Sequence, residues 1–176
     1  MNEPDNICWS GQFLRIVKRG RWEITQRHNC NGVVGIIPIT DQGEVVLVEQ
    51  YRIPVEANVI ELAAGLSGDS AEYENEPLQQ AAERELLEET GYAATDWEVV
   101  GKGASSAGLT DEITTFFFAR GLQKINGGGG VASESITVHC VKIDELEDWL
   151  AKQEAAGKIL DAKIYAAMYW IFKYCR

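Results

Sequence analysis

The sequence is short of features that mark several large classes of protein. It has four cysteines without a CxxC pair, two histidines far apart and four prolines among 176 residues. Such cysteines and histidines argue against a disulfide framework or a zinc site and favour reduced thiols. No apolar run approaches the roughly 18 residues of a membrane span, and the first residues do not resemble a signal peptide. We therefore expect a cytoplasmic protein without a membrane partner.

Basic residues are also scarce. The chain has 16 Lys and Arg against 27 Asp and Glu, a formal net charge of -11. This balance argues against a nucleic-acid partner, because binding to a phosphate backbone requires a basic surface. Hydrophobic residues make up 45% of the chain, so it can bury one substantial core. A phosphate-bearing substrate would need metal ions to offset the acidic surroundings.

Acidic residues are concentrated in the stretch that most clearly indicates chemistry. If 77–90 is a helix, Glu85, Glu88 and Glu89 lie three and four residues apart on one helical face. Pro77 suits the start of this helix and Gly91 its end. Like charges so placed repel each other unless a divalent cation binds them, and Mg²⁺ prefers such oxygen ligands. The alternative is an acidic helix face that is simply solvated.

This stretch resembles the Nudix box, the signature of the Nudix hydrolases. The family pattern is Gly, five residues, Glu, seven residues, then Arg-Glu-apolar-x-Glu-Glu-x-Gly-apolar, and its second half matches from Glu76 through Arg84 to Gly91. The first half departs, because ten residues separate Gly65 from Glu76, which makes the loop five residues longer. The resemblance implies that Arg84 orients the glutamates, and that the metal ligands include Glu85, Glu88 and Glu89.

Flanking segments resemble the ADP-ribose pyrophosphatase branch of the family. The segment QYR implies that Arg52 contacts substrate, although a surface arginine is the alternative. The segment VIELAAGL implies that the Ala64 carbonyl ligates metal and that Glu61 supports the site or binds substrate. The loop 105–112 implies that Glu112 lies near the reaction centre, unless it is only part of a turn. GKILDAK also matches this branch.

The general base and the substrate base are assigned less directly. In the resembling enzymes, a loop just before a strand carries a glutamate that acts as the general base. This resemblance indicates Glu134 as the general base here, with Glu89 or Glu112 as the alternatives. Trp22 is a candidate for stacking on the substrate base, or else packs within the N-terminal strands. The glycine run 127–130 reads as a flexible loop.

The resemblance implies Mg²⁺-dependent hydrolysis, with Mn²⁺ as a substitute, of nucleoside diphosphate sugars. ADP-ribose would give AMP and ribose 5-phosphate, and GDP-mannose would give GMP and mannose 1-phosphate. Two alternatives remain. One is a Nudix enzyme that acts on dinucleoside polyphosphates, coenzyme A or oxidised nucleotides. The other is a non-catalytic Nudix regulator that binds a ligand.

The predicted fold belongs to the α+β class and is the Nudix α/β/α sandwich with a mixed β-sheet. Alternating residues over 9–28 predict an N-terminal hairpin, so residues 1–30 form a dimerisation element and 31–176 the hydrolase domain. Dense apolar runs predict a second hairpin that turns at 41–43, and a strand at 113–119. Acidic residues at its start and Gly157 at its end predict a helix within 144–157, and periodic apolar residues predict another within 157–174. We expect a homodimer.

Overall fold

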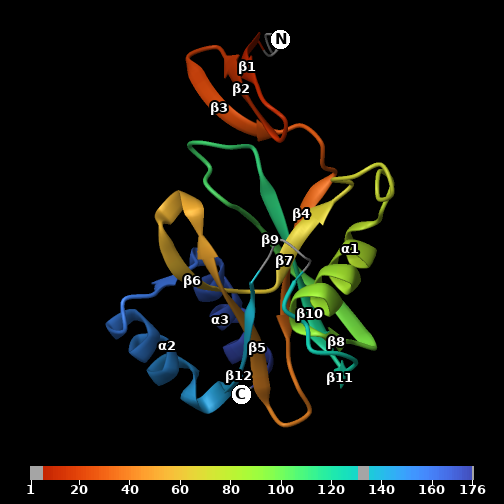
Figure 1. The fold of residues 1–176 in the computed structure, drawn as a ribbon, viewed down its shortest axis with the longest axis vertical. Coiled ribbons are helices and arrows are strands. Elements are labelled where there is room, and N and C mark those ends of the chain that lie inside the picture. Colours follow the sequence, from red (N-terminus) through yellow and green to blue (C-terminus); the bar gives the residue numbers. More distant parts are fainter. Residues whose placement is uncertain (1–5, 131–134, 176) are drawn as a thin grey trace.

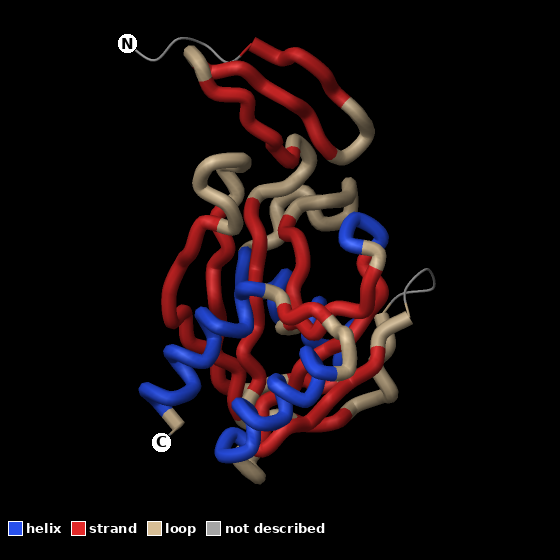
Figure 2. The backbone as a smooth tube through the Cα atoms, turned by 90° about the vertical axis from the view of Figure 1, so that its left-hand side faces the viewer, coloured by secondary structure: helices blue, strands red, loops and turns tan. Residues whose placement is uncertain are grey.

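The computed structural model describes residues 6–130 and 135–175 (Figures 1 and 2). In chain order the strands are β1 (Asn6–Ser10), β2 (Leu14–Arg19), β3 (Trp22–Arg27), β4 (Gly32–Pro38), β5 (Glu44–Arg52), β6 (Ala57–Glu61), β7 (Ala64–Ser67), β8 (Tyr92–Ala93), β9 (Asp96–Ala104), β10 (Ile113–Arg120), β11 (Gln123–Lys124), β12 (Thr137–Lys142) and β13 (Ile159–Leu160). The helices are η1 (Ile53–Val55), α1 (Leu78–Glu85), η2 (Leu86–Thr90), η3 (Ile143–Glu145), α2 (Leu146–Ala155) and α3 (Ala162–Tyr174).

The N-terminal strands form an antiparallel sheet in the order β1-β2-β3. The predicted hairpin over 9–28 corresponds to β2 and β3, which turn at Gly20 with a φ of 59°. The prediction missed β1, because that strand pairs with β2 through an irregularity between Ile7 and Trp9 that breaks the alternating pattern. The element is therefore a three-stranded sheet and not a simple hairpin.

Two four-stranded sheets, β7-β4-β10-β9 and β12-β5-β6-β13, make up the centre of the molecule. Each contains one parallel pair, β10 with β4 and β13 with β6, so the predicted mixed character is confirmed. The predicted second hairpin is wrong. β4 and β5 belong to different sheets, and only an isolated bridge from Ile39 to Val45 joins them after the turn.

The helices cover opposite sides of this centre (Figure 1). Alternate residues of β4 divide between two cores: Val34 and Ile36 pack in the core that contains Ala82 and Leu86 of the α1–η2 helix, while Ile37 packs with Ile164 of α3. This period of two is what a strand buried on both faces requires. The predicted α/β/α sandwich is confirmed, and so are the strand at 113–119 and the two C-terminal helices.

The N-terminal sheet projects from one end of the molecule and contacts the loop between β9 and β10 (Figure 1). The backbone N–H of Thr25 donates to the carbonyl oxygen of Leu109 at 2.9 Å, and the Gln26 amide donates to Asp111. These contacts fix the end of β3 beside the loop that leads to Glu112. No helix in the described part of the chain has both the length and the apolar character needed to cross a membrane.

Candidate active site

A pocket of about 340 Å³ lies where the ends of many elements meet. It collects Arg52 from the end of β5, Glu61 from the end of β6, and the β7 backbone at Ala64. The helix that follows supplies Glu85 and Glu89. The whole lining consists of Arg27, Val33, Arg52, Glu61, Ala64, Gly65, Leu66, Asp69, Glu85, Glu89, Glu112, Thr114 and Lys163. Six residues singled out from the sequence thus share one pocket: Arg52, Glu61, Ala64, Glu85, Glu89 and Glu112.

The acidic helix runs from 78 to 90, close to the predicted 77–90, and changes its winding on the way. α1 ends at Glu85, and the last turn, η2, is a π-helix that ends where Gly91 adopts a φ of 73°. Pro77 is the residue just before the helix. Single π-helical turns occur frequently at functional sites. Here the wider turn carries Glu88 and Glu89.

Gly65 lets the Glu85 side chain reach the pocket. A Cβ atom at position 65 would lie 2.0 Å from both Cδ and Oε1 of Glu85. The β7 backbone therefore runs directly against the carboxylate, and only glycine leaves room for it. The close approach of β7 to Glu85 therefore explains why the Nudix pattern has a glycine at this position.

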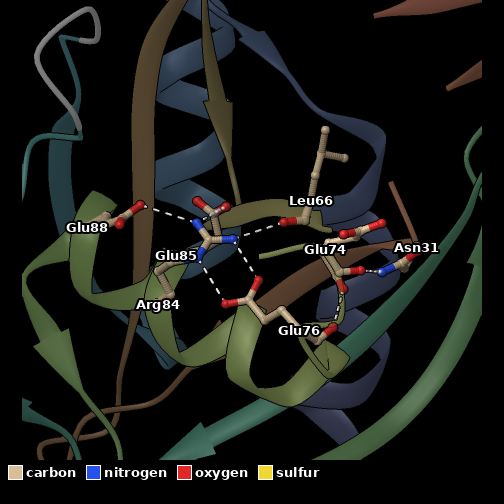
Figure 3. Close-up of polar contacts among 8 residues, drawn as sticks. Asn31, Leu66, Glu74, Glu76, Arg84, Glu85 and Glu88 are labelled. Atoms are coloured by element: carbon tan, nitrogen blue, oxygen red, sulfur yellow. Dashed lines mark hydrogen bonds and ion pairs between the residues drawn. The ribbon is translucent and has the colours of Figure 1, made fainter. Parts of the chain in front are cut away.

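Arg84 holds the carboxylates of the helix together (Figure 3). Its Nε and Nη2 donate to the two oxygens of Glu76, both at 3.1 Å. Its Nη1 donates to Glu85 at 2.8 Å and to Glu88 at 3.4 Å, and Nη2 also donates to the Leu66 carbonyl at 3.0 Å. The guanidinium is thus bonded on every nitrogen, and its role in orienting the glutamates stays a prediction.

Glu89 is the most enclosed of the three helix glutamates, with 6% of its surface exposed. One of its carboxylate oxygens accepts a hydrogen bond from the backbone N–H of Ala64 at 3.1 Å. The side chain and the β7 backbone are therefore in direct contact at the pocket wall. Glu89 and Ala64, both predicted to ligate metal, are consequently neighbouring residues at this wall.

Arg52 and Glu61 form a two-pronged ion pair at another wall. Nε and Nη2 of Arg52 donate to the two oxygens of Glu61 at 2.6 and 2.7 Å. The Glu61 side chain is 4% exposed and that of Arg52 is 44% exposed, so the buried acid fixes the more exposed base. This pairing raises the pKa of Arg52. The ion pair uses Nε and Nη2 of Arg52, so Nη1 is not part of it.

Glu112 connects the pocket to the N-terminal sheet. It accepts hydrogen bonds from Nε of Arg27 at 2.7 Å and from the Ser105 hydroxyl at 2.6 Å. Burial opposes ionisation of Glu112, but the bonds from Ser105 and Arg27 outweigh it and lower the pKa of this carboxyl. Arg27 thereby becomes part of the pocket, although it comes from β3.

Comparison with protein families matches the NUDIX domain over residues 31–167. The chain belongs to the Nudix family. Curated relatives include a methanol dehydrogenase activator from Bacillus methanolicus, 35% identical over 76% of this chain and 65% of the relative. An ADP-ribose pyrophosphatase from Bacillus subtilis is 33% identical over 78% and 71%. A GDP-mannose pyrophosphatase from Yersinia pestis is 33% identical over 76% and 66%. The chain spans about two thirds of the length of these relatives.

The Nudix fold is also apparent from solved structures. A crystal structure of an ADP compounds hydrolase superposes with a TM-score of 0.74, covering 99% of this chain and 92% of that one. The two sequences are only 17% identical, so the likeness concerns the fold. The Nudix box accordingly corresponds to β7, the loop after it, and the α1–η2 helix.

The Nudix box offers donors that suit a hard divalent cation. Carboxylates of Glu85 and Glu89 and the backbone at Ala64 line the same pocket. Burial, with the nearby charges of Glu88 and Asp69, raises the pKa of Glu85 to about 7 although Arg84 opposes this. A bound cation would favour the ionised form. As the side chains stand, no three acidic, His or Cys groups of the described residues converge into a ready coordination set. Ion binding therefore requires these carboxylates to turn toward one point.

Three predicted site residues, Trp22, Glu88 and Arg84, are not among the residues that line the pocket. Trp22 lies in β3 and is 53% exposed, and its ring centroid is 5.9 Å from Cζ of Arg21. It therefore does not reach the pocket of its own chain. Glu134 lies outside the described residues, and its assignment as general base stays a prediction. Arg84 is bonded to Glu88 and also to Glu85, which does line the pocket.

Three charged lining residues were missed by sequence reasoning: Arg27, Asp69 and Lys163. Lys163 lies within the GKILDAK segment, whose likeness to the ADP-ribose pyrophosphatases was noted without a role for the lysine. Its Nζ contacts Asp161, the residue that caps α3, at 2.6 Å. Arg27 and Asp69 carry no local signal, because only the fold brings their segments to the pocket.

Proposed function

We propose that this Nudix protein hydrolyses the diphosphate bond of nucleoside diphosphate sugars in a Mg²⁺-dependent reaction. One observation carries the proposal: helix carboxylates and three cationic side chains line the same pocket of about 340 Å³. The carboxylates suit Mg²⁺, while Arg27, Arg52 and Lys163 suit the phosphate oxygens of a substrate. ADP-ribose and GDP-mannose are the substrates to test first, because relatives named for both match this chain.

Each side chain has a distinct task in this proposal. Glu85, Glu88, Glu89 and the Ala64 carbonyl hold Mg²⁺, or Mn²⁺ in its place, which when bound neutralises phosphate charge and acidifies water. Arg84 keeps the carboxylates oriented by its hydrogen bonds. Arg52, fixed by Glu61, directs its remaining nitrogen to the substrate.

The proton of the attacking water needs a carboxylate acceptor. We propose Glu134 for this task, as the sequence predicts, with Glu89 and Glu112 as the alternatives. Glu112 lines the pocket, but it already accepts hydrogen bonds from Arg27 and Ser105. These bonds favour a role in holding the pocket together and contacting substrate over a role as general base. Glu89 is held by the Ala64 N–H and is better placed as a metal ligand.

The test is a substrate profile of the purified chain with ADP-ribose, GDP-mannose and UDP-glucose, with and without Mg²⁺. We expect hydrolysis only with the metal, with a nucleoside monophosphate and a sugar phosphate as the products. Diadenosine polyphosphates, coenzyme A and an oxidised nucleotide are included in the same panel. A preference for any of these would place the protein in another Nudix branch.

A second candidate is a regulator that binds a ligand or a partner enzyme, since one relative is named as a methanol dehydrogenase activator. The two functions differ in one measurement, because only the hydrolase releases a sugar phosphate in the absence of any other protein. The box glutamates Glu85 and Glu89 at the pocket, with Glu88 linked to Glu85 through Arg84, favour the hydrolase.

We also propose that residues 1–30 serve in forming a homodimer around the 31–176 domain. The N-terminal sheet exposes large apolar side chains that a monomer would leave in water, namely Ile7, Trp9, Phe13 and Trp22. In such a dimer, Trp22 could serve only a pocket of the other copy. Sedimentation equilibrium tests this, and a monomer at micromolar concentration would contradict it.

A further inference from the structure

The loop between β7 and α1, which exceeds the Nudix box pattern by five residues, is tied down along its length. The backbone N–H of Asn31 donates to the Ser67 carbonyl at 2.7 Å, and the Ser67 hydroxyl donates to the Glu76 carbonyl at 2.6 Å. The Asn31 amide also donates to the Glu74 carbonyl at 2.5 Å (Figure 3). The extra residues therefore form a fixed structure against the start of β4 and the Nudix helix.

The loop adds one contact to the carboxylate network. The ring of Tyr73 lies against the guanidinium of Arg84, with 4.5 Å between Cζ of the arginine and the ring centroid. A turn bond from the Tyr73 N–H to the Ser70 carbonyl at 3.0 Å, and one from the Glu76 N–H to the Tyr73 carbonyl at 2.9 Å, place the ring there. An arginine over an aromatic face within about 6 Å is attracted by the ring quadrupole.

The ring holds the part of Arg84 that its hydrogen bonds leave unrestrained. All of these bonds lie near the plane of the guanidinium, because its N–H groups point outward within that plane. They fix where its edges point, and the Tyr73 ring, whose centroid lies 4.5 Å from Cζ, adds a restraint that comes from none of these bonds. Since only 16% of the Arg84 side chain is exposed, the contact is largely sheltered from water, where such attraction is stronger.

We propose that Tyr73 is a positioning residue that fixes Arg84 and thereby holds Glu85 and Glu88 ready for the divalent cation. The inference rests on the proposed metal-dependent function and adds a part supplied by this chain's longer loop. Without the ring, Arg84 samples other positions, and part of the free energy of cation binding is then used to order Glu85 and Glu88. Metal affinity then falls while the pocket itself keeps its residues.

The test measures Mn²⁺ binding by electron paramagnetic resonance of the free ion, together with the Mg²⁺ concentration that half-activates hydrolysis. For Tyr73→Leu we expect Mn²⁺ binding about tenfold weaker, with a similar rise in the Mg²⁺ requirement. Tyr73→Phe keeps the ring and should stay within about twofold of the wild type. Tyr73→Gln, which suits a half-buried surface position, is measured in parallel and should behave as Tyr73→Leu does.

Two further variants separate positioning from a general effect on the fold. Tyr169→Leu is the matched control, because Tyr169 is an exposed tyrosine of α3 whose ring centroid lies 5.8 Å from Nζ of Lys173. This variant should leave metal binding unchanged. In an Arg84→Lys background, Tyr73→Leu should cause no further loss, since the planar fork that the ring supports is gone.

Several results would overturn the inference alone: unchanged Mn²⁺ binding in Tyr73→Leu, equal loss in Tyr73→Phe, or a full additional loss in the Arg84→Lys background. A wild-type chain that binds neither Mn²⁺ nor Mg²⁺ would overturn the proposed function and the inference with it. Thermal unfolding of each variant accompanies the titrations, so that binding is compared between folded proteins.

Discussion

Gly65→Ala should remove activity while leaving the fold nearly as stable as before. The new Cβ would lie 2.0 Å from Cδ and Oε1 of Glu85 and 2.4 Å from its Cγ. An ordinary contact begins at 3.4 Å, so the carboxylate must retreat by about 1.4 Å. The atoms in the way are the far end of a flexible side chain, and Gly65 has no positive φ that would strain alanine. The backbone can therefore accept the change.

The magnitude follows from that displacement. A misplacement of about 1 Å in a reacting group can lower turnover about 100-fold, and we expect at least that loss in kcat/KM at saturating Mg²⁺. Stability should change by no more than about 1 kcal/mol, since alanine in a strand is favoured over glycine by 0.5–1 kcal/mol and offsets the loosened Glu85 contacts. Urea unfolding and a steady-state assay of sugar phosphate release measure the two quantities.

Gly103→Ala provides the control. Gly103 also lies in a strand, β9, but its Cβ would meet only Phe116, at an ordinary 3.5 Å. This variant should keep full activity. If Gly65→Ala retained kcat/KM within about threefold of the wild type, Glu85 would not need its observed position, and its assignment as a metal ligand in this geometry would be wrong.

Three other perturbations test separate parts of the site. Glu89→Gln should lower turnover by orders of magnitude without altering the melting temperature, because the amide oxygen can still accept from Ala64; near-normal turnover would refute the metal assignment. Glu134→Gln should lower kcat about 10²- to 10⁴-fold and leave KM nearly unchanged, whereas a change in KM alone would make it a substrate contact. Glu112 has a lowered pKa, so its ionised form stabilises the fold above about pH 4.5 and this contribution disappears as pH falls through its folded-state pKa. Arg27→Gln should therefore lower stability in urea at pH 7 and by progressively less as the pH falls below 4.5, and a loss that does not change with pH would show that the ion pair is not responsible.

The Nudix helix was predictable because its signals are local. The spacing of Glu85 and Glu89 sets their common face, and Gly91 ends the helix with a left-handed backbone conformation. No longer-range information is needed for either. The π-helical last turn was not predictable, since it depends on how η2 packs between the sheet and the segments that follow it.

The second hairpin failed for the opposite reason. Its turn exists, with the Thr40 N–H donating to the Glu44 carbonyl at 2.9 Å. Beyond that turn, β4 pairs with β7 and β10, while β5 pairs with β6 and β12. Partners distant in sequence supply more buried strand surface than the neighbouring strand, and nothing within residues 31–52 reveals them. The same long-range assembly delivers Arg27 and Lys163 to the pocket.

The glycine run shows how a segment without a helical or strand pattern can still be fixed by the site. It read as a flexible loop, yet the Gly129 N–H donates to the Glu89 carbonyl at 2.9 Å and the Gly130 N–H to the Glu88 carbonyl at 3.0 Å. Any side chain at Gly128 would collide with the Thr90 backbone, at 2.5 Å. The run thus caps carbonyls that the end of the helix leaves unpaired. Close approach of two backbones needs glycine, so the run is explained by the Nudix helix that it contacts, some forty residues earlier in the chain.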